Sequence, residues 1–284
     1  MRAAVALQYL LPHRALSRLV YWATRWTWRP WKDFLIARIV RAYAIDVGQA
    51  LEPDPHAYPS FNAFFTRALK PDARPLPDDP RAVLAPADGT ISQLGAIDGQ
   101  RIFQAKGLDY TAGELLADER AAALYANGSF ITVYLSPRDY HRVHMPAAGT
   151  LRETVHVPGR LFSVAPFTVN AVPRLFARNE RLACHFDGDD GPFAVVLVGA
   201  MLVSSVETVW SGLEIPPYAR AVTHKSFIER GIRLERGAEL GRFNMGSTVI
   251  LLFPPGRVTW APDAIGNAKI QVRSSLGRLA SGNN

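Results

Sequence analysis

The chain of 284 residues has a single cysteine, Cys184, and this scarcity excludes several classes of structure. One thiol can form neither an internal disulfide nor a cysteine-based zinc cluster. Low-complexity segments and repeats at the spacing of solenoids or propellers are also absent. The apolar runs at residues 3–7 and 194–203 fall far short of the roughly 20 residues that span a bilayer. Polar residues interrupt the N-terminal apolar stretch, which is not typical of a secretory signal.

Apolar residues make up 48% of the chain and charged residues 20%, so the chain can bury a large core in one or two domains. Basic residues outnumber acidic ones by 32 to 25, and most of this excess lies at the N-terminus. Residues 1–50 carry eight basic and two acidic side chains, a net charge of +6 out of the total of +7. Nucleic-acid binding is therefore not expected, because most of the chain is nearly neutral.

The basic N-terminal stretch also holds four of the six tryptophans, Trp22, Trp26, Trp28 and Trp31. Arg, Trp and aliphatic residues at helical spacing are typical of an amphipathic helix that lies in a membrane interface. We expect helices at residues 15–23 and 31–44, broken at Pro30. The alternative is an ordinary basic helical hairpin that packs on its own domain and turns its arginines to water.

The residue composition of the sequence changes after residue 81, from helical patterns to patterns typical of strands. A short helix capped by Ser60 and two Pro/Asp-rich connections, at 53–59 and 70–81, precede the change. Strands are predicted from β-branched and aromatic runs at 83–84, 90–97, 130–135, 151–157, 182–186, 193–203 and 248–253. The sequence thus predicts an α+β fold. A mainly antiparallel β catalytic body at residues 71–284 follows a helical membrane-associating segment and linker at residues 1–70.

Three places in the sequence hold side chains that could carry chemistry. Asp88 precedes Gly89, a pair that is typical of an ordinary turn. His141 and His144 lie three residues apart directly after a predicted strand. Ser247 stands in a small corner between Gly246 and Thr248, at the start of a strongly apolar strand.

The two histidines admit three interpretations. As metal ligands they lack a clear set of partners, and no metal site is predicted here. As a structural pair, one ring would bond a backbone carbonyl and the other would lie at the surface. As acid and base groups they need a hydroxyl and an orienting carboxylate, which Ser247 and Asp88 could supply.

The corner at Ser247 has the local form that backbone self-cleavage needs. The small residue before the serine leaves the Gly246 carbonyl open, and a tight turn can aim the Ser247 hydroxyl at it. Attack would convert the peptide into an ester, with a histidine accepting the hydroxyl proton and an aspartate orienting that histidine. The sequence spacing alone does not show that these three side chains meet.

At these residues the sequence closely resembles the bacterial phosphatidylserine decarboxylases, which are pyruvoyl enzymes that make phosphatidylethanolamine. The similar segments are dispersed over the chain, at residues 7–12, 61–65, 86–95, 134–146, 175–181 and 246–250. Met245 departs from the leucine of the family, but this exchange conserves volume. The short tail after Phe253 is a second departure, expected to matter little.

The resemblance implies a role for each candidate residue. Asp88 orients His144, His144 acts as the base, and Ser247 attacks the Gly246 carbonyl. β-Elimination and hydrolysis then release ammonia and leave a pyruvoyl group, a covalent cofactor derived from Ser247. Cleavage gives a β chain of residues 1–246 and an α chain of residues 247–284. His141 is expected to protonate the α-carbon after decarboxylation through a Schiff base.

The same resemblance implies the substrate, the partners and the location. Phosphatidylserine stays in its bilayer, so we expect a peripheral protein on the cytoplasmic side of the cell membrane. Basic residues would add attraction to an anionic membrane surface. The cleaved α and β chains should stay together as a heterodimer, and family similarity suggests a homodimer of that unit.

Two other functions remain open on the sequence. A hydrolase could use Asp88, His144 and Ser247 on an external ester without self-processing, although the Gly-x-Ser-x-Gly elbow is absent. A non-catalytic adaptor at the membrane surface would need only the N-terminal segment. Replacement of Ser247 distinguishes the adaptor, which should be unaffected, from both enzymes.

Overall fold

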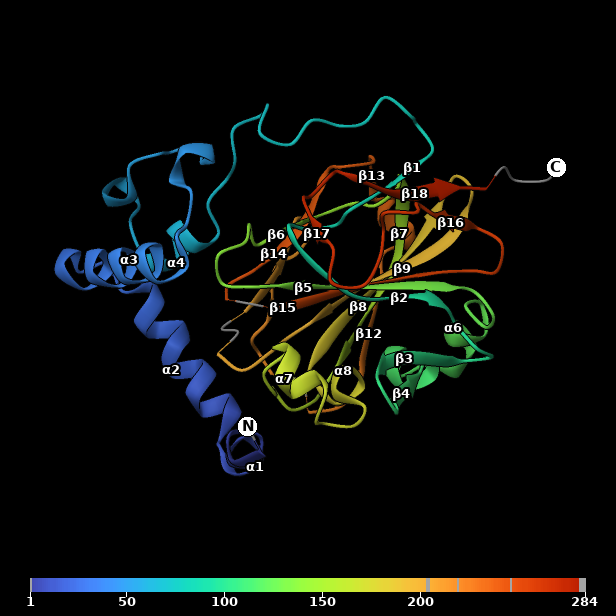
Figure 1. Cartoon of the computed structure of the whole chain (residues 1–284), viewed down its shortest axis with the longest axis horizontal. Helices are drawn as coiled ribbons and strands as arrows, with labels where there is room; N and C mark the ends of the chain where they lie inside the picture. The colour runs from blue at the N-terminus through green and yellow to red at the C-terminus, as the bar shows by residue number, and fades with distance from the viewer. Residues whose placement is uncertain (1, 203–204, 219, 246, 281–284) are drawn as a thin grey trace.

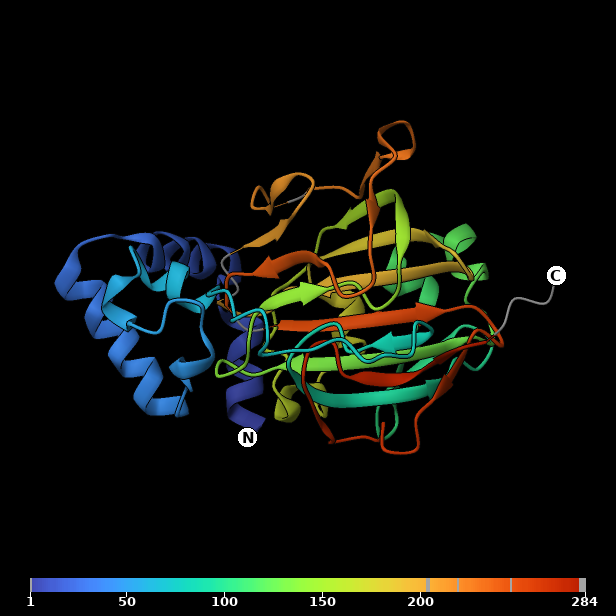
Figure 2. The ribbon, with the colours of Figure 1, turned by 90° about the horizontal axis from the view of Figure 1, so that it is seen from above.

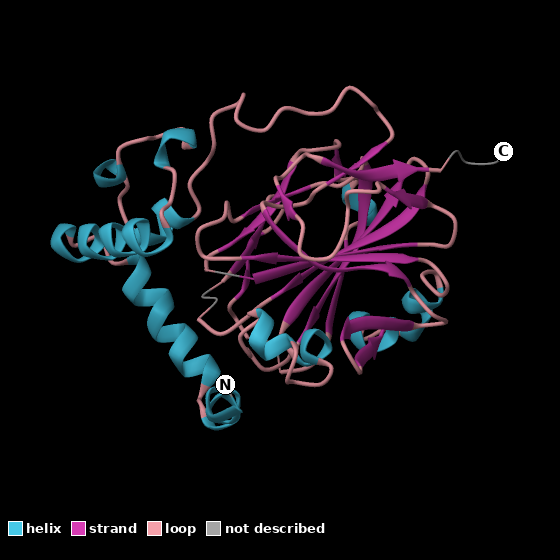
Figure 3. Cartoon of the chain, in the orientation of Figure 1, coloured by secondary structure: helices cyan, strands magenta, loops and turns pink. Residues whose placement is uncertain are grey.

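The computed structural model describes residues 2–202, 205–218, 220–245 and 247–280, which form a helical segment beside a large β body (Figure 1). Figure 2 shows the same arrangement from above, with the N-terminal helices at one end of the strands. The division into cyan helices and magenta strands is plain in Figure 3. A long connection between α4 and β1 joins the two regions.

Three longer helices and one short one build the N-terminal segment, and smaller helices decorate the body. The helices of the segment are α1 (Arg2–Leu10), α2 (His13–Arg25), α3 (Arg29–Tyr43) and α4 (Phe61–Phe65). Single 3-10 turns are η1 (Val47–Gln49), η2 (Pro55–Ala57) and η3 (Ile228–Arg230). The helices of the body are α5 (Ala112–Leu116), α6 (Glu119–Ala123), α7 (Pro166–Val169) and α8 (Leu175–Arg178).

A nine-stranded antiparallel sheet forms the centre of the body, in the order β12-β7-β8-β9-β15-β5-β2-β17, with β13 also paired to β7. Its strands are β2 (Gly89–Ala96), β5 (Ser129–Leu135), β7 (Gly149–Val157), β8 (Arg181–Gly188), β9 (Gly191–Val198), β12 (Thr223–Ser226), β13 (Arg233–Leu234), β15 (Ser247–Phe253) and β17 (Lys269–Ile270). All seven residues of β15 are buried, because β5 and β9 flank the strand on both sides. This strand is therefore fixed in the middle of the fold.

Three smaller sheets complete the body. One has the order β11-β10-β14-β6, with β6 (Arg142–His144), β10 (Val206–Thr208), β11 (Gly212–Ile215) and β14 (Glu239–Phe243). Another has the order β1-β18-β16, with β1 (Ala82–Leu84), β16 (Val258–Trp260) and β18 (Ser275–Leu279). The hairpin of β3 (Arg101–Ala105) and β4 (Leu108–Thr111) is separate from both.

Two hydrophobic clusters match the two regions. The large cluster fills the β body and includes most of β5, β9 and β15 and half of β8. The small cluster belongs to the helical segment and contains Ile36, Ile45, Tyr58, Phe61, Phe64 and Phe65. Met245, which precedes the candidate cleavage position, packs against this small cluster. The helical segment thus contacts the chain directly beside Ser247.

The predicted fold class is confirmed, and most predicted elements are present. The Ser60 cap is also confirmed, since its hydroxyl accepts a hydrogen bond from the Ala63 amide over 3.2 Å. The prediction at Pro30 was wrong in detail, because α3 already begins at Arg29 and contains Pro30 in its first turn. Proline is tolerated there, since the first amide groups of a helix lack intrahelical partners. The break instead lies between Arg25 and Arg29, where Trp26 is extended and Trp28 is also non-helical.

Candidate functional site

Asp88 and Ser247 lie at the same end of the central sheet, on either side of β5. Ser247 opens β15 and pairs with Leu135 at the end of β5. On the other side of β5, Thr90 of β2 pairs with Tyr134, and Asp88 directly precedes β2. Two strand spacings separate β15 from β2, which is about 10 Å. The sheet register thus brings residues 159 positions apart in the chain to one edge.

The glycine after Asp88 has a steric role that the sequence did not reveal. A Cβ atom at Gly89 would lie 2.4 Å from the carbonyl oxygen of Tyr134. Only glycine therefore lets β2 approach β5 this closely. Asp88-Gly89 starts a strand here, in place of the ordinary turn that the pair alone suggests.

Asp88 forms an ion pair that sequence reasoning missed. Arg74 donates two hydrogen bonds to it, from Nε to Oδ1 at 3.0 Å and from Nη2 to Oδ2 at 2.6 Å. The Val272 amide donates a third, over 2.7 Å. Arg74 also donates to Oε1 of Gln49 at 2.7 Å, which connects Asp88 to the helical segment. Arg74 lies in the Pro/Asp-rich run that the sequence marked only as a linker.

His144 is held on both ring nitrogens, and this fixes its tautomer. Nδ1 lies 2.9 Å from the carbonyl oxygen of Gly237, which only accepts, so Nδ1 carries the proton. Nε2 lies 3.1 Å from the Tyr140 hydroxyl and accepts from it. Burial raises the pKa of Tyr140 to about 12, so this hydroxyl keeps its proton. The backbone amide of His144 also donates to the Pro86 carbonyl at 2.7 Å, close to Asp88.

Burial lowers the pKa of His144 below its ordinary value, and the bond to Gly237 only partly opposes this effect. The ring is therefore neutral near pH 7 and has a basic lone pair on Nε2. A neutral imidazole with a defined tautomer is suited to accept a proton.

His141 is more deeply buried than His144. Its ring packs on Phe65 with 4.1 Å between ring centroids, and Nδ1 lies 2.7 Å from the Asp139 carbonyl oxygen. Burial lowers the pKa of His141 to about 3. Within the described part of the chain, Nε2 has no hydrogen-bond partner. His141 is thus a neutral ring with one unused nitrogen, directly beneath the helical segment.

Ser247 is fully buried, and its Oγ makes no hydrogen bond to any residue that the structure describes. Two residues earlier in the chain, Met245 has a φ of 116°, in a region that non-glycine residues rarely adopt. Gly246 lies outside the described residues. An unpaired hydroxyl thus follows a backbone turn that is strained at Met245.

A polar network holds the chain just before this turn. The buried Asn244 donates from Nδ2 to Ser205 Oγ and to Oε1 of Glu207, the latter over 2.9 Å. Asn62, in α4, donates to Oδ1 of Asn244 at 2.9 Å. Arg25, at the end of α2, donates to Ser205 Oγ at 2.8 Å. The helical segment therefore contacts the network that positions the strained turn.

The structure gathers the predicted residues at one end of the sheet without linking them in a hydrogen-bonded chain. Among the described residues, no hydrogen bond connects Asp88 with His144 or His144 with Ser247. Arg74 and Tyr140 occupy the positions that such a chain would use. Tyr140 falls inside the similar segment at 134–146, so that segment was a usable signal. Nothing local in the sequence marks Arg74 or Asn244.

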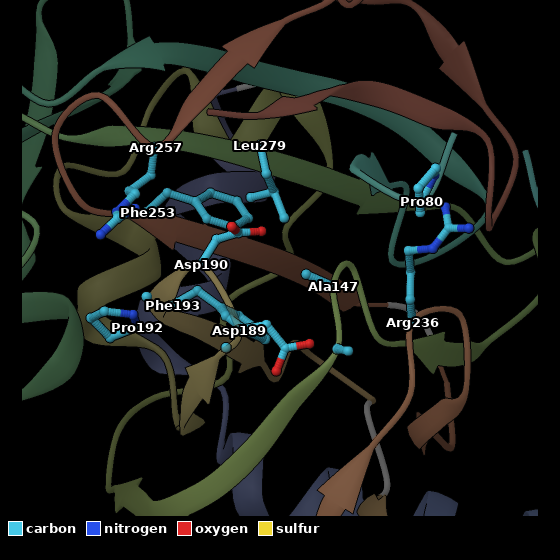
Figure 4. Close-up of a pocket in the computed structure, with 13 residues that line it drawn as sticks. Pro80, Ala147, Asp189, Asp190, Pro192, Phe193, Arg236, Phe253, Arg257 and Leu279 are labelled. Atoms are coloured by element: carbon cyan, nitrogen blue, oxygen red, sulfur yellow. The ribbon is translucent and has the colours of Figure 1, made fainter. Parts of the chain in front are cut away.

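Clefts beside these residues are rich in basic side chains. One cleft is lined by Leu69, Lys70, Pro71, Arg74, Tyr140, His144, Val272 and Arg273. A neighbouring cleft shares Arg74 and Tyr140 and adds Asp88, Arg67 and Arg138. A separate cavity, lined by Asp189, Arg236 and Phe253 among others, contains none of the predicted site residues (Figure 4). Phe253 ends β15, so this cavity lies at the opposite end of the strand from Ser247.

Comparisons with known proteins identify the family of the chain. A family model described as "Phosphatidylserine decarboxylase" matches residues 61–278, and a second model, described as "PSD", matches residues 3–44. A protein of Xanthomonas axonopodis pv. citri is 58% identical over 279 residues, which cover 98% of this chain and 99% of the relative. A protein of Xanthomonas euvesicatoria is 63% identical over 257 residues, covering 90% and 91%.

A protein of Alkalilimnicola ehrlichii is 60% identical over 250 residues, covering 87% of this chain and 86% of the relative. All three relatives are named phosphatidylserine decarboxylase proenzyme. The fold and these matches define an enzyme of the carboxy-lyase class. The chain belongs to the phosphatidylserine decarboxylase family.

Proposed function

We propose that the chain is a proenzyme that cleaves itself between Gly246 and Ser247 and then decarboxylates phosphatidylserine to phosphatidylethanolamine. The observation that carries this proposal is the buried Ser247 hydroxyl, which has no hydrogen-bond partner among the described residues, close to the strained Met245. A buried serine without a hydrogen bond is costly, and such a group is retained where it has a chemical task. A pyruvoyl group derived from Ser247 fits this position, because the serine lies at the end of a strand that the core holds on both sides.

Self-processing starts when Ser247 Oγ forms a bond to the Gly246 carbonyl carbon and the peptide C–N bond breaks. The base must accept the hydroxyl proton, and Nε2 of the neutral His144 carries the lone pair for it once the Tyr140 hydroxyl, which donates to this nitrogen in the structure, has moved away. Elimination then breaks the Cβ–Oγ bond of Ser247 and frees the Gly246 carboxylate. Hydrolysis of the remaining enamine releases ammonia. The products are a β chain of residues 1–246 and an α chain of residues 247–284.

Asp88 must change its partner before it can orient His144. In the structure both carboxylate oxygens accept bonds from Arg74. His144 already has an orienting acceptor, the Gly237 carbonyl, on Nδ1. We therefore propose that Asp88 is bound to Arg74 in the unprocessed chain and turns to His144 only when processing begins.

A pyruvoyl group formed from Ser247 would supply an electron-withdrawing carbonyl that can take up the electron pair released with CO2. The residues of this chain bind and orient the substrate. The clefts beside Asp88 and His144 are lined by Arg67, Arg74, Arg138, Lys70 and Arg273, which suit an anionic phosphodiester headgroup. These arginines also favour a substrate carboxylate before its loss.

His141 is proposed as the group that returns a proton to the α-carbon. Its ring is neutral in the described state, since burial holds its pKa near 3. Proton uptake at the unused Nε2 must therefore accompany substrate binding, because an approaching anionic headgroup raises the pKa of a neighbouring imidazole. His144 is the alternative donor, as its pKa is less strongly lowered.

The N-terminal helices are proposed to place this site at an anionic membrane surface, on the cytoplasmic side of the cell membrane. In α2 the polar His13, Ser17 and Thr24 are buried, whereas Leu19 and Trp22 are exposed. Their exposed fractions are 66% and 68%. In α1, Leu7 and Leu10 are exposed in the same way. An outward apolar face with flanking arginines fits a bilayer interface.

No helix among the described residues is long and apolar enough to cross a membrane. Attachment is therefore proposed to be peripheral. The cleaved α and β chains are proposed to stay associated, since β15 pairs with β5 and β9. The homodimer implied by the family resemblance stays a prediction.

Mass spectrometry of the purified, denatured protein tests the function directly. We expect a small chain that starts at position 247 and carries a ketone in place of the serine amine. Ser247→Ala should leave one intact chain and abolish CO2 release from phosphatidylserine vesicles. Ser211→Ala is the matched control, because this serine lies in a surface turn of the body, away from β15.

An unbroken wild-type chain that releases CO2 would overturn the proposal. An unbroken chain that hydrolyses esters would instead support the hydrolase alternative. The complete burial of Ser247 argues against that alternative, since an external ester has no access to its hydroxyl in this state.

A further inference from the structure

Three ligand-type side chains meet on the body, away from the decarboxylase site. They are Asp118, which precedes α6, Glu153 on β7 and His224 on β12. One candidate ligand atom from each lies within 4.8 Å of the other two. Nδ1 of His224 lies 3.4 Å from Oε2 of Glu153. Three chain segments that are distant in sequence thus converge on one point.

Local structure explains why these side chains point together. β12 and β7 pair with His224 opposite Val155 and Ser226 opposite Glu153. Alternate residues of a strand share a face, so His224 and Glu153 project from the same side of the sheet. Asp118 caps α6, and its Oδ1 accepts from the Arg120 and Ala121 amides at 2.8 and 3.1 Å. Oδ2 of Asp118 accepts no hydrogen bond from a described residue, so it is available to a ligand.

A fourth side chain supplies an independent reason to expect a ligand here. His185 lies directly opposite Glu153 in the pairing of β7 with β8, so both side chains leave the same face. His185 is only 6% exposed, and its Nε2 has no hydrogen-bond partner among the described residues. Buried polar atoms are normally paired, and an unpaired ring nitrogen needs an explanation.

His185 also shares a face of the sheet with His224, because Glu153 and His224 project from the same side. The three side chains come from the adjacent strands β8, β7 and β12. The unpaired ring of His185 is therefore on the face of the sheet where the cluster lies.

We propose that Asp118, Glu153 and His224 bind a divalent transition-metal ion, with His185 as a fourth ligand or as a neighbour that bonds a metal-bound water. Carboxylate and imidazole together suit Zn²⁺ or Mn²⁺, and three protein ligands plus water is a common zinc arrangement. Without metal, an exposed pair of His224 and Glu153 would be an ordinary surface ion pair. A surface ion pair of this kind does not explain why the buried His185 has no partner for Nε2 among the described residues.

The site is structural, because it lies far from Ser247 in the sheet. His185 aligns with Ala194 of β9, which aligns with Leu252 of β15. Leu252 is five residues from Ser247, about 17 Å along the strand. A bound ion would tie the start of α6 to β7 and β12. Since this inference does not rest on self-processing, the two can fail separately.

Metal titration of the purified full-length protein tests the site. After treatment with a chelator, the protein is equilibrated with ZnCl2, or with MnCl2 in parallel, and its bound metal is measured. We expect one equivalent bound at micromolar concentration and a higher unfolding temperature, because a ligand that binds only the folded state stabilises it. Glu153→Gln and His224→Ala should each weaken binding by about tenfold or more.

Two further variants separate metal binding from folding. Asp118→Asn removes the charge but keeps the helix cap, since Asn caps as well as Asp. It should weaken metal binding without lowering the unfolding temperature of the metal-free protein. His56→Ala is the matched control, because His56 forms a similar pair with Asp33, with Nδ1 and Oδ2 3.3 Å apart. It should retain the bound equivalent.

Absence of bound Zn²⁺ and Mn²⁺ would overturn the proposal. Equal binding by the wild type, Glu153→Gln and His224→Ala would also overturn it, because the metal would then lie elsewhere. Loss of metal binding in His56→Ala alone would also show that the metal lies elsewhere.

Discussion

The helix α2 and the strand β15 bury opposite kinds of side chain. β15 follows the ordinary rule of a water-soluble core, since all seven of its residues are buried. α2 reverses that rule, because its buried residues are the polar His13, Ser17 and Thr24 and its Leu19 and Trp22 are exposed. The body therefore has the buried apolar core of a protein that is stable in water. The helical segment instead exposes apolar side chains, whose contact with water is unfavourable.

The two regions nevertheless meet at the candidate site through polar contacts. Arg25 reaches Ser205, Asn62 reaches Asn244, and Arg74 joins Gln49 to Asp88. The exposed apolar face of the helices and the candidate catalytic residues of the body are thus different types of site that lie next to each other. The predictions below test this separation, from the largest expected effect to the smallest.

His144→Ala should slow self-processing by about 10² to 10⁴, because it removes the proposed general base. Cell-free synthesis followed by gel electrophoresis over time measures the appearance of the small chain. His56→Ala, on the exposed side of the helical segment, should process at the wild-type rate. Normal processing by His144→Ala would remove the histidine from the mechanism.

Leu251→Ala and Leu19→Ala make the same chemical change in the two regions. Leu251 is fully buried in β15, so its truncation should lower the free energy of unfolding by about 2–5 kcal/mol. Leu19 is 66% exposed, so its truncation should change that free energy by about 0.5 kcal/mol or less. Chemical denaturation of both variants in detergent-free buffer measures the difference. Equal losses would show that α2 buries Leu19 in solution.

Combined replacement of Leu19, Trp22 and Trp26 by alanine should weaken binding to anionic vesicles by more than about tenfold. Each apolar side chain that enters the bilayer contributes roughly 1.5–3 kcal/mol at full burial, and 1.4 kcal/mol corresponds to a factor of ten. Vesicle sedimentation measures the binding, and self-processing should be unchanged. Replacement of Leu213 and Val222, exposed residues of the body, is the matched control. Unchanged binding in the triple variant would reject the membrane-binding face.

The pH dependence of self-processing should reflect the lowered pKa of His144. The neutral ring is the active form, so the rate should be constant from pH 8 to about 6.5 and fall only at lower pH. The folded-state pKa is below the unfolded value, so the stability contributed by the neutral ring is also lost as the pH falls. A time course of cleavage at each pH tests this. A rate that already falls between pH 8 and 7 would contradict it.

The sequence predicted much of the fold because its strongest patterns are local. Residues 248–253 are consecutively apolar and β-branched, and they form the buried strand β15. The Ser60 cap and the helices predicted at residues 15–23 and 31–44 follow from equally local signals, although the predicted break at Pro30 was misplaced. By contrast, α1, the β3–β4 hairpin and β10–β14 lack such patterns and depend on contacts across the fold.

The sequence by itself determined the choice of candidate site residues, the basic aromatic N-terminus and the strand that carries Ser247. These follow from residue type and from spacing along the chain. Only the tertiary structure decided that Arg74 pairs with Asp88, that Tyr140 bonds His144, and that α2 turns its apolar side outward. Each of these depends on which distant segments pack together, and residue spacing does not encode that packing locally.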